Sequence, residues 1–124
     1  MFINVEFHSG SLTILTEFPQ KEDSQLHIQL TRSEYFLLTE LVSHQGQHLS
    51  KQHLTNKGWP DSYVGPNSIN VAIMSLRKKL RLLGGFWEIT TIQRHGYSLN
   101  LAMNHYYSIV DVSYYGEELG GANI

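Results

Sequence analysis

Apolar and polar residues alternate along the first thirty positions of the chain. The alternation covers residues 2–7, 11–16 and 26–30, and the triplet His8-Ser9-Gly10 separates the first two runs. Strict alternation is typical of a strand that buries one face, and a short turn-forming triplet between two such runs favours a hairpin. Residues 1–30 are therefore predicted to form a small antiparallel sheet with one buried face, interrupted by a polar loop over 19–24.

The spacing of apolar residues becomes helical after position 30. Residues 31–34 read Thr-Arg-Ser-Glu, which is a capping box. In such a box the Thr31 hydroxyl and the Glu34 carboxylate each accept a backbone amide at the start of a helix. The apolar residues that follow predict an amphipathic helix that ends near Gly46. Ser50 is the predicted N-cap of a short second helix over residues 51–57.

A third, longer helix is predicted over residues 66–83. Pro66 suits its first turn because proline lacks an amide hydrogen and fixes a helical φ, and the glycines at 84 and 85 suit its C-terminal cap. Its apolar residues form one stripe, the predicted buried face, made of Ile69, Ile73, Leu76, Leu80 and Leu83. At about 100° per residue the opposite face consists of Asn67, Asn70, Val71, Met74, Ser75, Lys78, Arg81 and Leu82.

A β-hairpin is predicted over residues 87–101, with its turn at Gln93-Arg94-His95-Gly96. The sheet over 1–30, the helices over 31–83 and this hairpin together predict one α+β domain over residues 1–103. The remaining residues, 104–124, are predicted to be a tail or linker, or to add a further strand.

The charge of the chain is unevenly distributed. Its net charge is −2, which alone argues against nucleic-acid binding. Between Asn67 and His95, however, five basic residues stand against one acidic residue, whereas the rest of the chain has four basic against ten acidic. Because a local basic patch matters more for DNA binding than the global sum, the third helix and the hairpin become the candidate binding region.

The composition of the chain argues against several classes of protein: disulfide-linked, membrane-spanning, metal-binding and enzymatic. The chain has no cysteine, which excludes disulfides and thiolate zinc sites and fits a reducing compartment such as the cytosol. No apolar run approaches the roughly 20 residues that span a bilayer, so the chain as given is expected to be soluble. His44, His48 and His53 invite a metal site, but a glycine interrupts the helix between the first two, and no metal or cofactor is predicted. No arrangement of a nucleophile, a base and an acid indicates an enzyme.

Two motifs in this order resemble a known family. The run Leu-Arg-Lys-Lys-Leu at 76–80 is followed by Thr-Ile-x-x-x-Gly-Tyr at 91–97, and both follow the predicted capping-box helix in the sequence. Together they resemble the winged helix-turn-helix DNA-binding domain of the OmpR/PhoB family of bacterial transcription regulators. Within that family the chain is more similar to the one-component, often membrane-anchored ToxR/CadC type, because no phosphoreceiver domain precedes it.

The resemblance implies a role for particular residues. The third helix would be the recognition helix in the major groove, the hairpin would be a wing on the adjacent backbone or minor groove, and the loop after the second helix could contact RNA polymerase. The residues implied to bind DNA are Asn67, Ser68, Asn70, Val71, Met74, Ser75, Lys78, Arg81, Gln93 and Arg94. The residues implied for the polymerase-contact loop are Trp59, Asp61, Ser62 and Tyr63, although Trp59 by itself is better interpreted as a core residue.

The sequence also departs from the family pattern. Family members often carry arginines where this chain has Ala72, Met74 and Ser75, and a basic residue where it has Gln93. Fewer phosphate contacts predict weak binding by a monomer, which would need a homodimer or a partner regulator. Asparagine can pair with adenine, and Met or Val can contact a thymine methyl, so the expected site leans toward A·T pairs.

Two function hypotheses follow. The first is sequence-specific binding of double-stranded promoter DNA by the cytoplasmic domain of a bacterial transcription activator, reaching a membrane only through a segment not in this chain. The alternative is a winged-helix protein-interaction module with little DNA binding of its own, which the net acidity favours. Arg77 lies at the flank of the apolar stripe and could pair with an acid instead of DNA.

Overall fold

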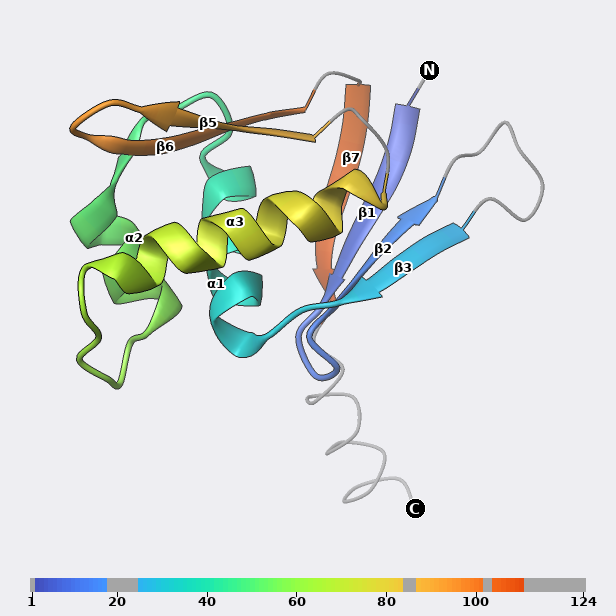
Figure 1. The fold of residues 1–124 in the computed structure, drawn as a ribbon. Helices are drawn as coiled ribbons and strands as arrows, with labels where there is room; N and C mark the ends of the chain where they lie inside the picture. Colours follow the sequence, from blue (N-terminus) through green and yellow to red (C-terminus); the bar gives the residue numbers. More distant parts are fainter. Residues whose placement is uncertain (1, 18–24, 84–86, 102–103, 111–124) are drawn as a thin grey trace, which may run out of the picture.

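The computed structural model of the chain describes residues 2–17, 25–83, 87–101 and 104–110 (Figure 1). Over these residues the secondary structure runs in the order sheet, helices, hairpin and a last strand. The strands are β1 (Phe2–His8), β2 (Thr13–Glu17), β3 (Gln25–Gln29), β4 (Leu49–Ser50), β5 (Trp87–Ile92), β6 (Gly96–Leu101) and β7 (Asn104–Val110). The helices are α1 (Arg32–Ser43), α2 (Lys51–Gly58) and α3 (Asn67–Arg81). The predicted α+β winged helix-turn-helix fold is confirmed.

The N-terminal strands form the predicted sheet, with one addition. β1 pairs with β2 and β2 with β3, both antiparallel, and the strand order among the described residues is β3-β2-β1-β7. β7 returns after the hairpin and pairs with β1 in parallel, with Val5 opposite Tyr107. Of the alternatives left open for residues 104–124, the strand therefore describes 104–110, and the sheet is mixed. The predicted loop over 19–24 lies outside the described residues.

Local signals in the sequence place the helix starts. In α1 the Glu34 amide donates to Thr31 Oγ1 at 3.2 Å and the Thr31 amide donates to Glu34 Oε1 at 2.8 Å, so the predicted capping box is confirmed. In α2 the His53 amide donates to the predicted N-cap, Ser50 Oγ, at 3.0 Å. The helix α1 ends at Ser43, before Gly46, whose φ of +83° turns the chain toward β4. The glycine cap predicted at 84 and 85 lies outside the described residues.

The apolar stripe of α3 forms the middle of the core. Its residues Ile69, Ile73, Leu76 and Leu80 are all buried, and Leu83 just beyond the helix is buried too, as predicted. They pack in one cluster with the buried face of α1, with Phe7 and Ile14 of the N-terminal sheet and with the hairpin. Burial of one such side chain contributes about 1.5–3 kcal/mol, so this stripe fixes which face of α3 points outward.

The hairpin β5–β6 runs along α3 (Figure 1) and turns at residues 93–95, as predicted. β4 adds a short antiparallel edge to β6, with Ser50 opposite Gly96. A Cβ at Gly96 would lie 1.9 Å from the Leu49 carbonyl oxygen, so this close approach of two backbones admits only glycine. The pair at 49 and 50 is too short to produce a periodic signal, which is why the sequence did not predict β4. Within the described residues no helix is long and apolar enough to cross a membrane.

Candidate nucleic-acid interface

The outward face of α3 carries polar, apolar and basic side chains in sequence along the helix. Asn67 near its start is exposed, and Val71 and Met74 are 56% and 58% exposed. Lys78 and Arg81 follow on the same side in the last turns and are also exposed. More than half of the surface of two large apolar side chains thus faces solvent between an amide at one end and two cations at the other.

The remaining predicted DNA-binding residues on α3 are half-buried: Ser68, Asn70 and Ser75. A groove of about 430 Å³ lies along this part of the helix and also reaches the start of α1 and Trp59. It brings together four of the predicted residues, Asn67, Ser68, Val71 and Ser75. The structure therefore gathers four of the predicted DNA-binding residues in one groove, while Asn70 and Met74 are not among its lining residues, and contact with DNA stays a prediction.

The basic run of α3 divides into two pairs with different surroundings. Lys78 and Arg81 face solvent, whereas Arg77 turns to the hairpin. The Arg77 Nη2 donates to the Ile89 carbonyl oxygen at 2.6 Å and to Thr91 Oγ1 at 3.0 Å, and its Nε donates to the same carbonyl at 3.1 Å. The Arg77 guanidinium therefore binds the hairpin backbone and a threonine, and not the acid that the sequence suggested as its partner.

Lys79 and Ser75 turn instead to a buried carboxylate on α1. Lys79 Nζ and Ser75 Oγ each lie 2.5 Å from an oxygen of Glu34, a residue that is only 3% exposed. Burial pushes the pKa of the Glu34 carboxyl upward, but the hydrogen bonds from Lys79, Ser75 and the Thr31 amide outweigh it, and the pKa is lowered from its ordinary 4.5. These contacts, the Glu34 network, fasten α3 to α1 and occupy the Ser75 hydroxyl.

Only one bond of the Glu34 network, the one to the Thr31 amide, could be predicted from the sequence. The capping box predicts the bond between Glu34 and the Thr31 amide, because both residues lie within one helical turn. The bonds to Ser75 and Lys79 span more than forty positions of the chain and depend on how α1 and α3 pack. No periodicity in the sequence carries that information.

The hairpin places its basic residue at the turn and its aromatic residue against α3. Gln93 and Arg94 are exposed at the tip, and Arg94 adopts a φ of 61°. Tyr97 is 5% exposed, and its hydroxyl donates to Asn70 Oδ1 at 2.9 Å. The Arg77 guanidinium lies 5.8 Å from the centre of the Tyr97 ring. The hairpin and α3 are therefore joined by direct polar contacts.

The loop after α2 contains the residues predicted to contact polymerase. Asp61, Ser62 and Tyr63 are exposed, and Tyr63 is 98% exposed. Trp59 is half-buried and packs against the core, which agrees with its interpretation as a core residue. Asp61 Oδ2 lies 3.6 Å from Arg32 Nη2 at the start of α1, which ties this loop to the helix bundle.

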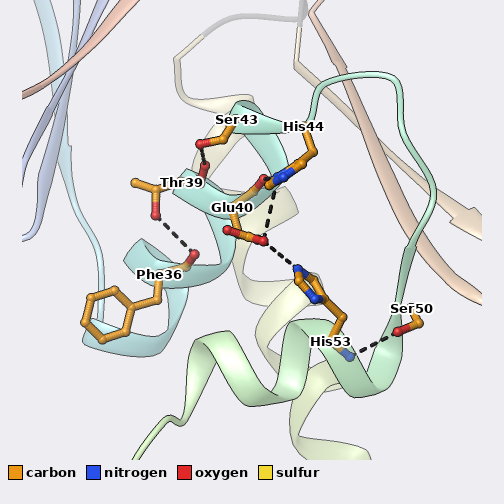
Figure 2. Close-up of polar contacts among 7 residues, drawn as sticks. All are labelled: Phe36, Thr39, Glu40, Ser43, His44, Ser50 and His53. Carbon is orange, nitrogen blue, oxygen red and sulfur yellow. Dashed lines mark hydrogen bonds and ion pairs between the residues drawn. The ribbon is translucent and has the colours of Figure 1, made fainter.

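Two of the histidines meet at a carboxylate between α1 and α2 (Figure 2). Glu40 Oε2 lies 2.5 Å from His53 Nε2 and 3.6 Å from His44 Nδ1. His48 is not part of this group, because its ring faces His95 of the hairpin turn at 6.2 Å between ring centres. Within the described residues no group of three or more His, Asp or Glu side chains is arranged to hold a metal ion. Glu40 thus acts as a polar bridge between the two helices.

Comparison of the sequence with protein-family models identifies the family of the chain. The family model described as "Transcriptional regulatory protein, C terminal" matches residues 24–99. The chain belongs to this family, the OmpR/PhoB-type domains. Membership makes it a DNA-binding domain for transcription regulation and not an enzyme.

The similar proteins include a transcriptional regulatory protein, a lantibiotic response regulator and the DNA-binding domain of E. coli CadC. The transcriptional regulatory protein DltR of Streptococcus agalactiae is 32% identical over 91 residues, which are 73% of this chain and 41% of DltR. The C-terminal domain of the nisin resistance regulator NsrR is 34% identical, with a TM-score of 0.54 over 68% of this chain and 82% of that chain. The DNA-binding domain of E. coli CadC is 25% identical, with a TM-score of 0.59 over 75% of this chain and 82% of that chain.

The chain spans about two fifths of the length of the curated relatives that it matches. CadC stands among the similar structures, at a lower identity than NsrR. The placement of this OmpR/PhoB-type domain nearest the one-component ToxR/CadC type therefore stays a prediction.

Proposed function

We propose that this OmpR/PhoB-type domain recognises promoter DNA as part of a bacterial transcription activator, with α3 in the major groove and the hairpin tip on the adjacent backbone or minor groove. The observation that carries this proposal is the outward face of α3. Its amide and apolar side chains, Asn67, Val71 and Met74, match the chemistry of base edges, and Lys78 and Arg81 follow where a helix leaving the groove meets phosphate.

The charge that remains available for phosphate is small. Arg77 and Lys79 are engaged within the fold, which leaves Lys78, Arg81 and Arg94 as exposed cations of this region. Each phosphate contact contributes about 0.9 to the slope of log affinity against log salt, so a monomer should show a slope of roughly −2.7. Such a shallow slope means weak binding, and the proposed active species is a homodimer or a complex with a partner regulator.

Polymerase contact by the α2–α3 loop is the second part of the proposal. Asp61, Ser62 and Tyr63 project from the loop, and a cleft of about 360 Å³ between Tyr63, Trp59 and α2 lies beside them. An exposed aromatic side chain beside a cleft suits contact with another protein. The proposed site of action is the cytoplasm, where promoter DNA and polymerase are found.

A competition assay on duplex DNA tests the proposal. Labelled upstream fragments of the source genome are bound across a salt series, with unlabelled specific and random duplexes as competitors. Lys78→Met and Arg81→Met should each make the salt slope shallower by about 0.9. The matched control is Lys57→Met, at an exposed lysine at the end of α2, which should leave the slope unchanged. Binding without sequence preference at low salt would overturn the proposal.

A protein-interaction module remains the second candidate because of the apolar surface of α3. Val71, Met74 and Leu82 are 56%, 58% and 71% exposed, which is unusual for large apolar side chains. If this face binds protein, Met74→Asp and Leu82→Asp should abolish an association that salt does not weaken. If the face reads DNA, Leu82→Asp should add a repulsive charge near phosphate and Met74→Asp should remove sequence preference.

A further inference from the structure

The hairpin residue Tyr97 holds a side chain of the recognition surface. We infer that Tyr97 is a positioning residue that fixes the Asn70 amide so that its nitrogen, not its oxygen, is presented to the DNA, and that the base pair read by Asn70 and Met74 is a thymine paired with adenine. This inference rests on the proposed function, because it concerns how the same helix face selects its bases.

Burial and the neighbouring Arg77 restrict the movement of the Tyr97 side chain. The residue belongs to β6 and is 5% exposed, and its hydroxyl lies 2.9 Å from Asn70 Oδ1. The Arg77 guanidinium covers the ring at 5.8 Å from its centre and is itself anchored to the Ile89 carbonyl at 2.6 Å. A buried ring with an anchored neighbour has little freedom to move its hydroxyl, so Tyr97 imposes an orientation on Asn70.

This orientation of the Asn70 amide leaves its nitrogen, a hydrogen-bond donor, available to a ligand. An asparagine amide has one oxygen that accepts and one nitrogen with two hydrogens to donate. Here the oxygen accepts from Tyr97, while the nitrogen lies 3.5 Å from Asn67 Oδ1, at the limit of a hydrogen bond. Asn70 can therefore offer a donor to the groove without losing its bond to the hairpin. Bidentate pairing with adenine would require the same oxygen to serve a second donor.

The neighbours of Asn70 narrow the choice of base. In the major groove thymine shows an O4 acceptor beside a C5-methyl group, and adenine shows an N7 acceptor beside an amino donor. Met74 lies one turn further along the same face as Asn70, and its side chain is 58% exposed. A donor from Asn70 and an apolar contact from Met74 together match thymine. Guanine offers acceptors but no methyl group, and cytosine offers neither.

The experiment begins with selection of the preferred sequence by the unaltered domain from a duplex library with randomised positions. Tyr97→Phe removes the hydroxyl and keeps the ring that Arg77 covers. The preference for the thymine pair should fall about 3- to 10-fold, while preferences at other positions and the salt slope stay unchanged. In an Asn70→Ala background the same change should have no further effect, because a double-mutant cycle isolates their coupling.

A change on the DNA side tests the same contact without altering the protein. Replacing the selected thymine by deoxyuridine removes only the methyl group, and it should weaken binding by the unaltered domain but not by Met74→Ala. Urea unfolding of each variant separates loss of fold from loss of preference.

The outcomes separate the inference from the proposed function. If Tyr97→Phe weakens binding to all sequences alike and adds to the effect of Asn70→Ala, then Tyr97 contacts phosphate directly and the inference is wrong. Selection of guanine or cytosine at the pair affected by Asn70→Ala would also overturn it. If the unaltered domain selects no sequence at all, the proposed function fails and the inference fails with it.

Discussion

The Glu34 network gives the sharpest test of how the recognition helix is held. Glu34 is 3% exposed, and Lys79, which donates to it from α3, has a side chain that is 29% exposed. Removing Lys79 leaves a buried carboxylate with fewer donors, whereas neutralising Glu34 leaves an ammonium group that can turn to water. The two partners of one ion pair should therefore have unequal effects on stability.

The magnitudes follow from this asymmetry. Removing one partner of a buried ion pair lowers the free energy of unfolding by about 3–5 kcal/mol. Because Glu34 keeps its bonds from Ser75 and the Thr31 amide, Lys79→Met should fall at the lower end, at about 3 kcal/mol. Glu34→Gln keeps an acceptor for the Thr31 amide and loses the charge-assisted part of the bonds, at about 1.5 kcal/mol. Lys78→Met, the exposed neighbour, is the matched control and should change the free energy of unfolding by less than about 0.5 kcal/mol.

Urea unfolding at several pH values measures both effects. The pKa of Glu34 is lowered in the folded state, so the network contributes fully above the ordinary carboxyl pKa and loses its contribution as the pH falls through the lowered value. The stability difference between the unaltered domain and Glu34→Gln should therefore be largest near neutral pH and shrink in acid. An equal cost for Glu34→Gln and Lys79→Met, or a difference that does not change with pH, would refute the reasoning.

Other parts of the interface give predictions of the same kind. Gly96→Ala should lower the free energy of unfolding by several kcal/mol in a thermal melt, because its Cβ would lie 1.9 Å from the Leu49 carbonyl oxygen; a melting temperature within a few degrees of the unaltered domain would contradict this. Arg77→Met should destabilise the hairpin by about 1–3 kcal/mol through the lost bond to the Ile89 carbonyl, and should leave the salt slope of DNA binding unchanged. A slope that falls by about 0.9 would instead place Arg77 on phosphate.

Elements whose signals lie within one or two turns of chain were predictable. The capping box at Thr31, the N-cap at Ser50 and the apolar stripe of α3 each combine residues that are close in sequence, and the structure has all three. The alternating runs predicted β1, β2 and β3 in the same way. The family motifs then identified the order of these elements as a winged helix-turn-helix domain.

Partners that are distant in sequence were not predictable. A helical wheel places Lys78 and Arg81 on the outward face of α3, but it does not show that Arg77 donates to the hairpin and Lys79 to α1. The partners of Arg77 and Lys79 depend on two packing interfaces, of α3 with the hairpin and with α1, that a wheel does not contain. The parallel pairing of β7 with β1 joins residues about a hundred positions apart, and its sequence left strand and linker equally open.

The central claim is that the outward face of α3 reads DNA with few phosphate contacts. The most direct measurement is the affinity of the domain for its selected duplex and for a random duplex across a salt series. The account predicts a clear preference for the selected duplex. It also predicts that a monomer shows a salt slope near −2.7 and that Lys78→Met makes this slope shallower by about 0.9. Equal affinity for both duplexes, or an affinity that salt does not change, would contradict it.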